Sequence, residues 1–402
     1  MRLLIADKLD ERPLKALGVL GLEVLCRPEL NAEELANALT DVNILVVRST
    51  KVTKAAIEAA PALNLIIRAG AGVNTIDVDA ASERGVYVSN CPGRNASAVA
   101  ELVMGLVLAL DRRIVDATVG LRAGRWEKGA LQDAPGLRGR RLGVAGLGSI
   151  GKLVLEHGAS FGMEASAWSR SFSPARAREL GVGHAASLVK LAAASDVLSV
   201  HLPFSPQTAG IIDERVLNAL PDGAIFINTA RAEVVDYPAL ERAIKAKGLR
   251  VGLDVFPSEP KGSSGSFQPA ILESGRVYGT PHIGASTDQA QRAIVEEVCR
   301  IVRSFLTEED VPNVVNVCKQ TPARFCLVLR ARDRVGVLAN VSSVIKRHGL
   351  NIEEVTNTIF QGAVAACTKL RLSGRPSETC LAEIRAFEEV MHVDVIPLPN
   401  LA

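Results

Sequence analysis

The chain has 402 residues, with 46 lysines and arginines against 44 aspartates and glutamates, for a formal net charge of +2. This length is too great for one hydrophobic core and sufficient for two or three domains. A near-neutral chain has no overall field to attract nucleic acid or an anionic membrane, so any anion binding must be local.

The seven cysteines follow no metal-ligand spacing and are typical of apolar packing positions in a reducing compartment. The N-terminal segment Met1–Asp7 reads as a strand followed by charge, without the layout of a signal peptide. The longest apolar run, Leu102–Leu110, is far shorter than the roughly 20 residues that span a bilayer. We therefore expect a soluble, cytoplasmic protein that binds no metal.

Residues 1–92 alternate short apolar strands with amphipathic helices, which predicts a parallel sheet with helices on both faces. The expected strands are Leu3–Ala6, Leu22–Leu25, Ile44–Val47, Leu65–Arg68 and Val86–Val88. The segment from Ala96 to Arg113 is apolar nearly all round, with Glu101 the one charge inside it. This pattern predicts a buried helix that joins two lobes.

The stretch from Arg141 to Arg170 predicts a strand, a tight glycine turn, a helix and a second strand. The turn reads Gly146-x-Gly148-x-x-Gly151. Bare backbone at its first two glycines lets a pyrophosphate come close, while the N–H groups that open the helix point at its charge. Since the turn lies between a strand and a helix, it indicates a dinucleotide site more strongly than a purely structural turn.

The second strand ends in Ser169-Arg170-Ser171. An acidic residue at this point normally accepts hydrogen bonds from the ribose 2′-OH of NAD. A cation and two hydroxyls suit a 2′-phosphate better, so the sequence predicts that NADP is used at least as well as NAD. The alternative is that Arg170 is an ordinary solvated surface charge.

The second α/β region continues with four strands, Val197–Val200, Ala224–Asn228, Arg250–Asp254 and Val277–Gly279. A helix is expected over Thr287–Leu306, and the segment Thr307–Pro322, which contains two prolines and mixed charge, reads as a linker. Beyond it the pattern changes to strand 325–331, helix 335–348, strands 350–360 and 364–372, helix 376–390 and strand 392–397. This order predicts a small ferredoxin-like βαββαβ module.

Five motifs in this order resemble the D-isomer-specific 2-hydroxyacid dehydrogenase family. They are Gly146–Gly151, His201–Pro203, Ile227–Arg231, Asp254–Pro260 and Thr280–Thr287. Within the family, Val47–Val52 and Arg68–Val73 resemble the substrate lobe of the branch that oxidises D-3-phosphoglycerate, and the C-terminal module resembles the regulatory ACT domain. The resemblance implies a substrate-binding domain at 1–96 and 288–316, a dinucleotide-binding domain at 97–287 and an ACT-like domain at 325–402.

His282 is the candidate acid/base, because imidazole titrates near neutral pH and this residue follows a strand at the edge where α/β sites form. Glu259 would hydrogen-bond the far ring nitrogen of His282, fix its tautomer and raise its pKa. Arg231 follows the strand Ala224–Asn228, and its guanidinium can clamp a carboxylate bidentately and polarise the adjacent carbonyl. The simpler alternative for each of these side chains is a surface or structural role.

The resemblance also implies cofactor and substrate contacts. The expected cofactor residues are Ala71, Gly146, Gly148, Ser149, Ile150, Gly151, Ser169, Arg170, Ser171, His201, Leu202, Pro203, Thr229, Ala230, Arg231, Asp254, His282, Gly284 and Ala285. The expected substrate residues are Arg48, Arg68, Ala71, Gly72, Val73, Asn95, Lys128, Arg231 and His282, with Arg48, Arg68 and Lys128 as cations for a distal phosphate. In the family, a basic residue at the position of Lys128 reaches a neighbouring subunit, so a homodimer or homotetramer is expected.

The resemblance predicts hydride transfer from C2 of D-3-phosphoglycerate to NAD or NADP, giving 3-phosphooxypyruvate at the entry to serine synthesis. A glyoxylate or hydroxypyruvate reductase is the nearest enzymatic alternative, and a nucleotide-sensing scaffold on the same fold is another. In the module, the stretch Ala331–Gly336 lacks the His-x-Asn pair that helps related ACT domains to hold serine. An amino-acid effector, another small ligand or a purely subunit-holding role therefore remain open for this module.

Overall fold

The computed structural model describes residues 1–402 except 11–12, 15, 261–264, 308–309, 319–320 and 400–402. The chain forms two compact units, Met1–Asn316 and Val317–Ala402. The first unit holds a five-stranded and a seven-stranded parallel sheet, and the second holds a four-stranded antiparallel sheet. The predicted fold class, two doubly wound lobes followed by a βαββαβ module, is confirmed.

The five-stranded sheet has the order β2-β1-β3-β4-β5. Its strands are β1 (Arg2–Ile5), β2 (Glu23–Cys26), β3 (Ile44–Val47), β4 (Leu65–Arg68) and β5 (Tyr87–Asn90). Around it lie the 3₁₀ turn η1 (Ala16–Leu20) and the helices α2 (Ala32–Ala38), α3 (Lys54–Glu58), α4 (Val78–Glu83) and, from the end of the unit, α12 (Asp288–Leu306).

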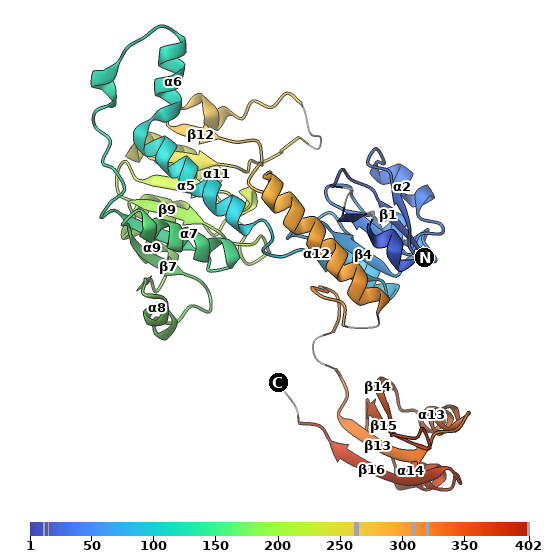
Figure 1. Cartoon of the computed structure of the whole chain (residues 1–402). Helices are drawn as coiled ribbons and strands as arrows, with labels where there is room; N and C mark the ends of the chain where they lie inside the picture. Colours follow the sequence, from blue (N-terminus) through green and yellow to red (C-terminus); the bar gives the residue numbers. More distant parts are fainter. Residues whose placement is uncertain (11–12, 15, 261–264, 308–309, 319–320, 400–402) are drawn as a thin grey trace. The chain divides into compact units, whose positions relative to one another are not determined.

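Alternate side chains of these strands enter two separate cores, as the pleat of a strand requires. Leu4 and Leu45 pack with Leu35 and Ile57 of α2 and α3 on one face. Leu3, Ile44 and their neighbours pack on the other face with the apolar side of α12. Figure 1 shows α12 lying alongside this sheet, although almost 200 residues separate it from β5 in the chain.

The seven-stranded sheet has the order β12-β11-β10-β9-β6-β7-β8. Its strands are β6 (Arg141–Ala145), β7 (Glu164–Trp168), β8 (Gly183–His184), β9 (Val197–Val200), β10 (Ile225–Asn228), β11 (Arg250–Leu253) and β12 (Val277–Gly279). Its helices are α5 (Ala96–Arg112), α6 (Ile114–Arg122), α7 (Ser149–Ser160), α8 (Pro174–Leu180), α9 (Leu188–Ala193), α10 (Glu214–Ala219) and α11 (Tyr237–Lys247), with 3₁₀ turns η2 (Lys128–Leu131), η3 (Ala232–Val234) and η4 (Ala270–Glu273).

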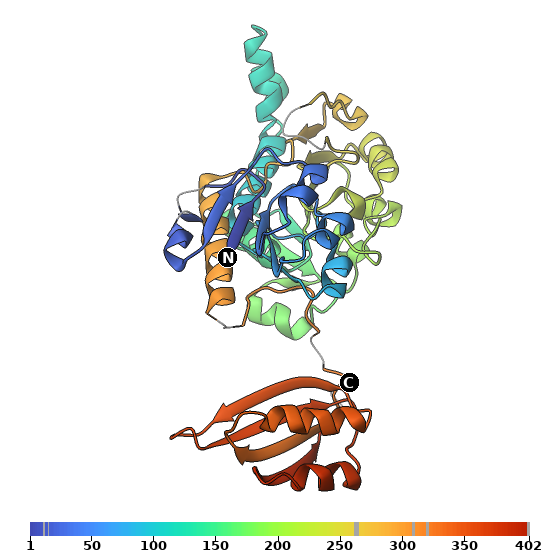
Figure 2. The same cartoon turned by 90° about the vertical axis from the view of Figure 1, so that its right-hand side faces the viewer.

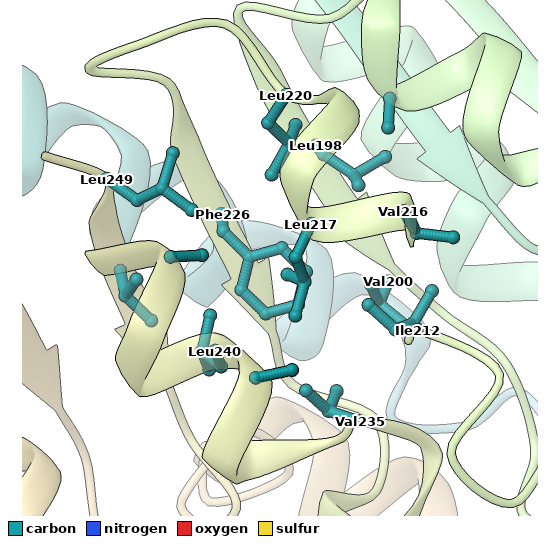
Figure 3. Packing of buried hydrophobic residues seen from close by; sticks show 14 of the residues in the cluster. Leu198, Val200, Ile212, Val216, Leu217, Leu220, Phe226, Val235, Leu240 and Leu249 are labelled. Atoms are coloured by element: carbon teal, nitrogen blue, oxygen red, sulfur yellow. The ribbon is translucent and has the colours of Figure 1, made fainter. Parts of the chain in front are cut away.

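This sheet is also buried on both faces, which explains why its strands read as continuous apolar runs. On one face Phe226 of β10 is fully buried and its ring lies between Leu217 of α10 and Leu240 of α11 (Figure 3). On the other face Val103 and neighbouring residues of α5, the predicted buried helix, pack with α7. The two cores hold the carboxyl ends of the strands at one edge, where the candidate site lies.

Two expectations about the connections need correction. Residues 312–316, predicted as part of a linker, form an isolated bridge to β5 of the first sheet: Val315 N–H donates to Val88 O at 2.9 Å, and Ser89 Oγ–H donates to Pro312 O at 2.6 Å. The edge strand β5 therefore finds a partner for its backbone groups, which the charge and proline content of the segment did not suggest.

The second unit contains β13 (Phe325–Arg332), α13 (Val337–Arg347), β14 (Ile352–Ile359), β15 (Ala365–Leu372), α14 (Glu378–Arg385) and β16 (Val390–Pro397), with sheet order β14-β15-β13-β16. The helix predicted to reach residue 390 ends at Arg385, so that expectation was wrong. Val390 N–H donates to Phe387 O in a turn, and strand alternation then buries Val393 in the core. Among the described residues, no helix is long and apolar enough to cross a membrane.

Candidate active site

The glycine turn lies between β6 and α7, as predicted. Gly146 has φ +105°, and a β-carbon there would lie 2.4 Å from His201 O. A β-carbon at Gly151 would lie 2.0 Å from Gly146 O, so only glycine allows the helix to start against the strand. The N-cap residue of α7, Gly148, gives its first N–H groups no side-chain acceptor, and they remain available to an anion.

Two buried polar atoms at the carboxyl ends of β9 and β10 lack hydrogen-bond partners among the described residues. His201, at the end of β9, shares a 2.8 Å hydrogen bond between Nε2 and Ser199 Oγ, but Nδ1 has no partner within the described part of the chain. Thr229 Oγ1, after β10, is likewise buried and unpaired there. Burial lowers the pKa of His201 to about 3, so its ring is neutral at physiological pH. The glycine turn, the uncapped helix and these two atoms fit a dinucleotide.

The residues after β7 form a turn in which Phe172 N–H donates to Ser169 O at 3.0 Å. Arg170 and Ser171 in this turn are exposed. In the part of the chain that the structure describes, Arg170 has no hydrogen-bonding or ion-pair partner. The turn therefore carries a free cation and no carboxylate at the strand end where a ribose 2′-position is expected.

His282 and Glu259 form the contact that the sequence predicts. His282 Nδ1–H donates to Glu259 Oε2 at 2.7 Å, and Glu259 Oε1 accepts from Phe256 N–H at 2.8 Å. The hydrogen bond that His282 donates to Glu259 raises the pKa of His282 above its ordinary value, against the opposing effect of burial. Burial alone would raise the pKa of Glu259, but its hydrogen bonds to His282 and Phe256 outweigh burial and lower it. The second ring nitrogen of His282 is thus left for a substrate.

Asp254, at the end of β11, shapes the loop that carries His282. Its two carboxylate oxygens accept from Thr280 Oγ1 at 2.6 Å, Ile283 N at 2.8 Å and Gly284 N at 2.9 Å. His282 itself has φ +52°, a conformation that a non-glycine residue adopts only when its surroundings hold it. The observed bonds of Asp254, predicted as a cofactor residue, supply that support.

Arg231 lies on the turn after β10. Buried Asn228 fixes this turn, since its amide donates to Arg231 O at 2.9 Å and its carbonyl accepts from Ala230 N at 3.0 Å. Arg231 Nη1 donates to Ala230 O, and Nη2 reaches the loop of the five-stranded sheet: a β-carbon on Gly72 would lie 3.1 Å from it. The predicted carboxylate clamp therefore faces the predicted substrate loop.

Arg48 and Arg68 lie at the carboxyl ends of the neighbouring strands β3 and β4 and are half-buried. Arg68 Nε donates to Arg48 O at 3.1 Å, and Arg48 Nη1 donates to Gln291 Oε1 at 2.8 Å. Burial lowers the pKa of Arg68, and the nearby charges of Arg231 and Arg48 lower it further. Within the described residues, neither of these guanidinium groups donates to a carboxylate. Three arginines thus lie close enough for their charges to repel one another.

Two cavities share His282, Glu259 and Phe256 as lining residues. The first, about 580 Å³, is also lined by Arg231. The second, about 780 Å³, is also lined by Arg48. His282 therefore has the carboxylate clamp in one adjoining cavity and a candidate phosphate cation in the other, which suits a substrate of a few carbons with two charged ends.

The remaining predicted residues occupy three places. Ala71, Gly72 and Val73 form the loop after β4, where Asn90 Nδ2 donates to Ala71 O at 2.6 Å. Around the second sheet lie Asn95 at the N-cap of α5, Ser149 and Ile150 in the first turn of α7, Leu202 and Pro203 after β9, Ala230 beside Arg231, and Gly284 and Ala285 after His282. Lys128 lies apart from these, on the arm after α6.

The sequence analysis missed several supporting residues. Gln291 of α12 accepts from Arg48 and donates through Nε2 to Ala285 O at 2.8 Å, so it links the two sheets. Asp7 accepts from the backbone N–H groups of Arg48, Ser49 and Thr50 and fixes the turn after β3. A polar residue directly after a strand was the available signal for Asp7, whereas nothing in the sequence distinguishes Gln291 from a surface position of α12.

Comparisons with known proteins agree with this geometry. Residues 104–284 match the sequence profile of the D-isomer specific 2-hydroxyacid dehydrogenase NAD binding domain. The chain is 40% identical over 346 residues to D-3-phosphoglycerate dehydrogenase of Mycobacterium tuberculosis, covering 85% of this chain and 63% of that protein. It is 41% identical over 309 residues to a hydroxypyruvate reductase of Thermotoga maritima, covering 76% of this chain and 98% of that protein.

Among solved structures, an NADPH-dependent glyoxylate/hydroxypyruvate reductase from Sinorhizobium meliloti superposes with a TM-score of 0.69 at 29% identity, covering 78% of this chain and 97% of that one. The chain spans only 58% to 63% of the length of the curated bacterial phosphoglycerate dehydrogenases it matches. The match to the Thermotoga protein covers nearly all of that protein. Together with the ordered motifs and the site geometry, these matches show that the chain belongs to the D-isomer specific 2-hydroxyacid dehydrogenase family.

Proposed function

We propose that this chain oxidises D-3-phosphoglycerate at C2 to 3-phosphooxypyruvate, using NAD or NADP. The observation that carries the proposal is the group of three arginines, Arg48, Arg68 and Arg231, which converge without a carboxylate partner for the first two among the described residues. A substrate with one carboxylate and one phosphate supplies the missing negative charge. The 40% identity to a phosphoglycerate dehydrogenase supports the same substrate.

In this proposal the substrate-binding domain consists of residues 1–96 and 288–316. The dinucleotide-binding domain consists of residues 97–287, and the ACT-like domain of residues 325–402. A bound nicotinamide supplies the hydride acceptor. The glycine turn, the start of α7, His201 and Thr229 would hold the cofactor. Residues of both domains then hold the substrate in one orientation relative to the cofactor, and this orientation contributes to the rate.

The proposed chemical step needs a base, a clamp and a hydride acceptor. Arg231 holds the substrate carboxylate and polarises the C2 oxygen. His282 Nε2 takes the hydroxyl proton as the C2–H bond breaks and its electron pair leaves as hydride, so that C2–O becomes a carbonyl. Glu259 stabilises the imidazolium that results, through its bond to Nδ1–H. In the reverse direction His282 returns the proton.

One assay separates this proposal from its rivals. Initial rates would be measured with NAD or NADP crossed with D-3-phosphoglycerate, and with the reduced cofactors crossed with 3-phosphooxypyruvate, hydroxypyruvate and glyoxylate. The proposal predicts the highest kcat/KM for the phosphorylated pair. A higher value for hydroxypyruvate or glyoxylate would favour the reductase alternative, which the 41% identity to the Thermotoga protein supports. No turnover with any of them would favour a nucleotide-sensing scaffold.

We also propose that NADP is accepted at least as well as NAD. The support is the free guanidinium of Arg170 between two serines, in a turn without a carboxylate. An Arg170→Ala variant is expected to raise KM for NADP without raising KM for NAD. A wild-type kcat/KM that favours NAD by about a hundredfold, or about 2.7 kcal/mol, would contradict this preference.

For partners, we propose a homodimer or a homotetramer. The helix α6 and the following turn form an arm that extends from the body (Figure 2) and exposes apolar side chains, among them Leu121 at 58% and Trp126 at 81%. Lys128 lies on this arm and would reach the site of a second copy. Analytical ultracentrifugation should show a dimer or larger species for the wild type and dissociation for Leu121→Glu. A monomeric wild type would contradict the proposal.

The ACT-like module would add a second contact or an effector site. Its edge strand β14 exposes Val355 at 53% and Ile359 at 54%, and Phe360 follows it at 54%. Titration of the activity with L-serine to millimolar concentration tests whether an amino acid acts here. Inhibition would assign the module a regulatory ligand, whereas no effect would leave another small ligand or subunit contact as its role.

A further inference from the structure

A histidine on the neighbouring strand β8 supports the turn Ser169–Phe172. This histidine lies outside the family motifs. His184 ends β8, the outermost strand beside β7, and its Nε2 lies 3.0 Å from Phe172 O. Since a carbonyl only accepts, His184 carries its proton on Nε2 and donates. The two rings also contact each other, with centroids 5.6 Å apart at an interplanar angle of 38°.

The local sequence explains why the imidazole reaches this carbonyl. Gly183 pairs with Ser166, and a β-carbon on Gly183 would lie 2.9 Å from Ser166 Cβ. Glycine therefore lets β8 lie close to β7, with His184 opposite Ala167. From this position the ring reaches Phe172 in the turn after β7.

Other contacts also hold the turn, since Phe172 packs against the core beside α7 and the sheet. Phe172 N–H bonds to Ser169 O within the turn, and Ser173 caps α8 by accepting from Arg176 N–H at 3.2 Å. Arg170 contributes no bond to a described residue. Among the described residues, the His184 bond is the one side-chain hydrogen bond that joins the turn Ser169–Phe172 to the sheet.

We propose that His184 is a positioning residue for the adenosine end of the cofactor. By holding Phe172 it keeps the turn in the shape in which Arg170 and the serine hydroxyls can receive a 2′-phosphate. This inference rests on the proposed acceptance of NADP. Without the hydrogen bond from His184, part of the binding free energy of the 2′-phosphate is spent on ordering the turn. NAD lacks that phosphate, so its binding is weakened little.

The test measures cofactor binding alone, so that it does not depend on the identity of the substrate. Dissociation constants of NADPH and NADH would be determined by cofactor fluorescence with the full chain. The variants are His184→Ala, His184→Gln, Arg170→Ala and, as a matched control, His392→Ala, which removes an exposed histidine of the second unit that contacts Asp394.

His184→Ala is expected to weaken NADPH binding about fivefold, the size of one net hydrogen bond, and to leave NADH binding unchanged. His184→Gln should restore NADPH binding, because its amide can donate to the same carbonyl, and His392→Ala should resemble the wild type. Unchanged NADPH binding in His184→Ala, or equal weakening of both cofactors, would overturn the inference.

The two proposals fail differently. If Arg170→Ala weakens NADPH binding and His184→Ala does not, the acceptance of NADP stands and the role of His184 is wrong. If the wild type binds NADPH about a hundredfold more weakly than NADH, the proposed cofactor preference fails, and the 2′-phosphate role of His184 fails with it.

Discussion

The carboxyl edges of the two parallel sheets in the first unit carry different kinds of polar and charged groups. The seven-stranded sheet ends in bare backbone, neutral polar atoms and a histidine already paired with a carboxylate. The five-stranded sheet ends in Arg48 and Arg68, whose guanidinium groups donate to no carboxylate among the described residues, although Asp7 lies nearby. At the first edge the acid/base pair is charge-balanced without a ligand, although Arg170 and Arg231 also lie there, and the second edge offers two guanidinium groups to an anion.

This difference suggests how the two edges divide the work. A preorganised, charge-balanced acid/base pair suits chemistry, because its groups need not reorganise as the reaction proceeds. An edge with unpaired cations suits recognition, because binding an anion relieves their mutual repulsion. Substitutions at the seven-stranded edge should therefore act mainly on kcat, and substitutions at the five-stranded edge mainly on KM.

The largest effect is expected for His282→Ala. Loss of the acid/base should lower kcat about a hundredfold to ten-thousandfold, with a smaller change in KM, since the arginines remain. Steady-state kinetics of both directions would measure this. Turnover close to that of the wild type would refute the assignment of His282 as acid/base. It would also refute the proposal that the seven-stranded edge carries the chemistry.

Arg231→Ala should combine both kinds of effect, since Arg231 follows the seven-stranded sheet but contacts the loop of the other. Removing charge-assisted bonds to a carboxylate should raise KM about ten- to a hundredfold and also lower kcat through poorer orientation. Arg231→Lys should recover only part of the loss, because lysine cannot clamp a carboxylate bidentately. Full recovery would indicate that only charge matters.

A smaller effect, on pH dependence, is expected for Glu259→Gln. The oxidation needs neutral His282, so the rate rises with pH as the imidazolium loses its proton. Glu259 raises the pKa of His282 through their hydrogen bond. Its replacement should move the acid limb of the kcat/KM profile to lower pH. An unchanged acid limb would exclude Glu259 as the partner that tunes His282.

The smallest effect on activity is expected at the junction of the two sheets. Glu297 of α12 is buried and accepts from Arg94 at 2.5 Å, Arg300 at 2.6 Å and Asn313 at 2.6 Å. The hydrogen bond from Arg300, chiefly, lowers the pKa of Glu297 to about 2. Glu297→Gln should cost about 1–2 kcal/mol of the free energy of unfolding, since both arginines are about half exposed.

The pH dependence of stability provides a control for the effect predicted for Glu297→Gln. A carboxylate whose pKa is depressed on folding stabilises the fold above its unfolded pKa and loses that contribution as pH falls toward its folded pKa. For Glu297 that window lies between the ordinary glutamate value and about 2. Thermal melts of the wild type and Glu297→Gln should converge across it. A constant difference in Tm down to that pH would contradict the proposed role of the charge.

The sequence predicted the parts of the molecule that follow local rules. Each expected strand of the first unit matches an observed one to within one or two residues, because continuous apolar runs between turns mark strands buried on both faces. The glycine turn and the contact between Glu259 and His282 were also expected, the latter from the resemblance to the family. Both depend on short motifs whose chemistry can be read residue by residue.

What the sequence did not predict depends on contacts between distant segments. Gln291 looks like any polar residue of a helix until folding brings it between Arg48 and Ala285. The segment 312–316 has the composition of a linker, but it pairs with the edge of β5 through an isolated bridge between Ser89 and Val314. His184 occupies a two-residue strand too short to show any periodicity.

The most direct test of the comparison is the substrate selectivity of Arg48→Glu. The ratio of kcat/KM for D-3-phosphoglycerate to that for D-glycerate would be measured in the wild type and in the variant, with the same cofactor. We expect the wild type to favour the phosphorylated substrate and the variant to lose most of that ratio through a raised KM for D-3-phosphoglycerate. An equal loss with both substrates would show that Arg48 does not recognise the phosphate and would contradict the proposed division between the two edges.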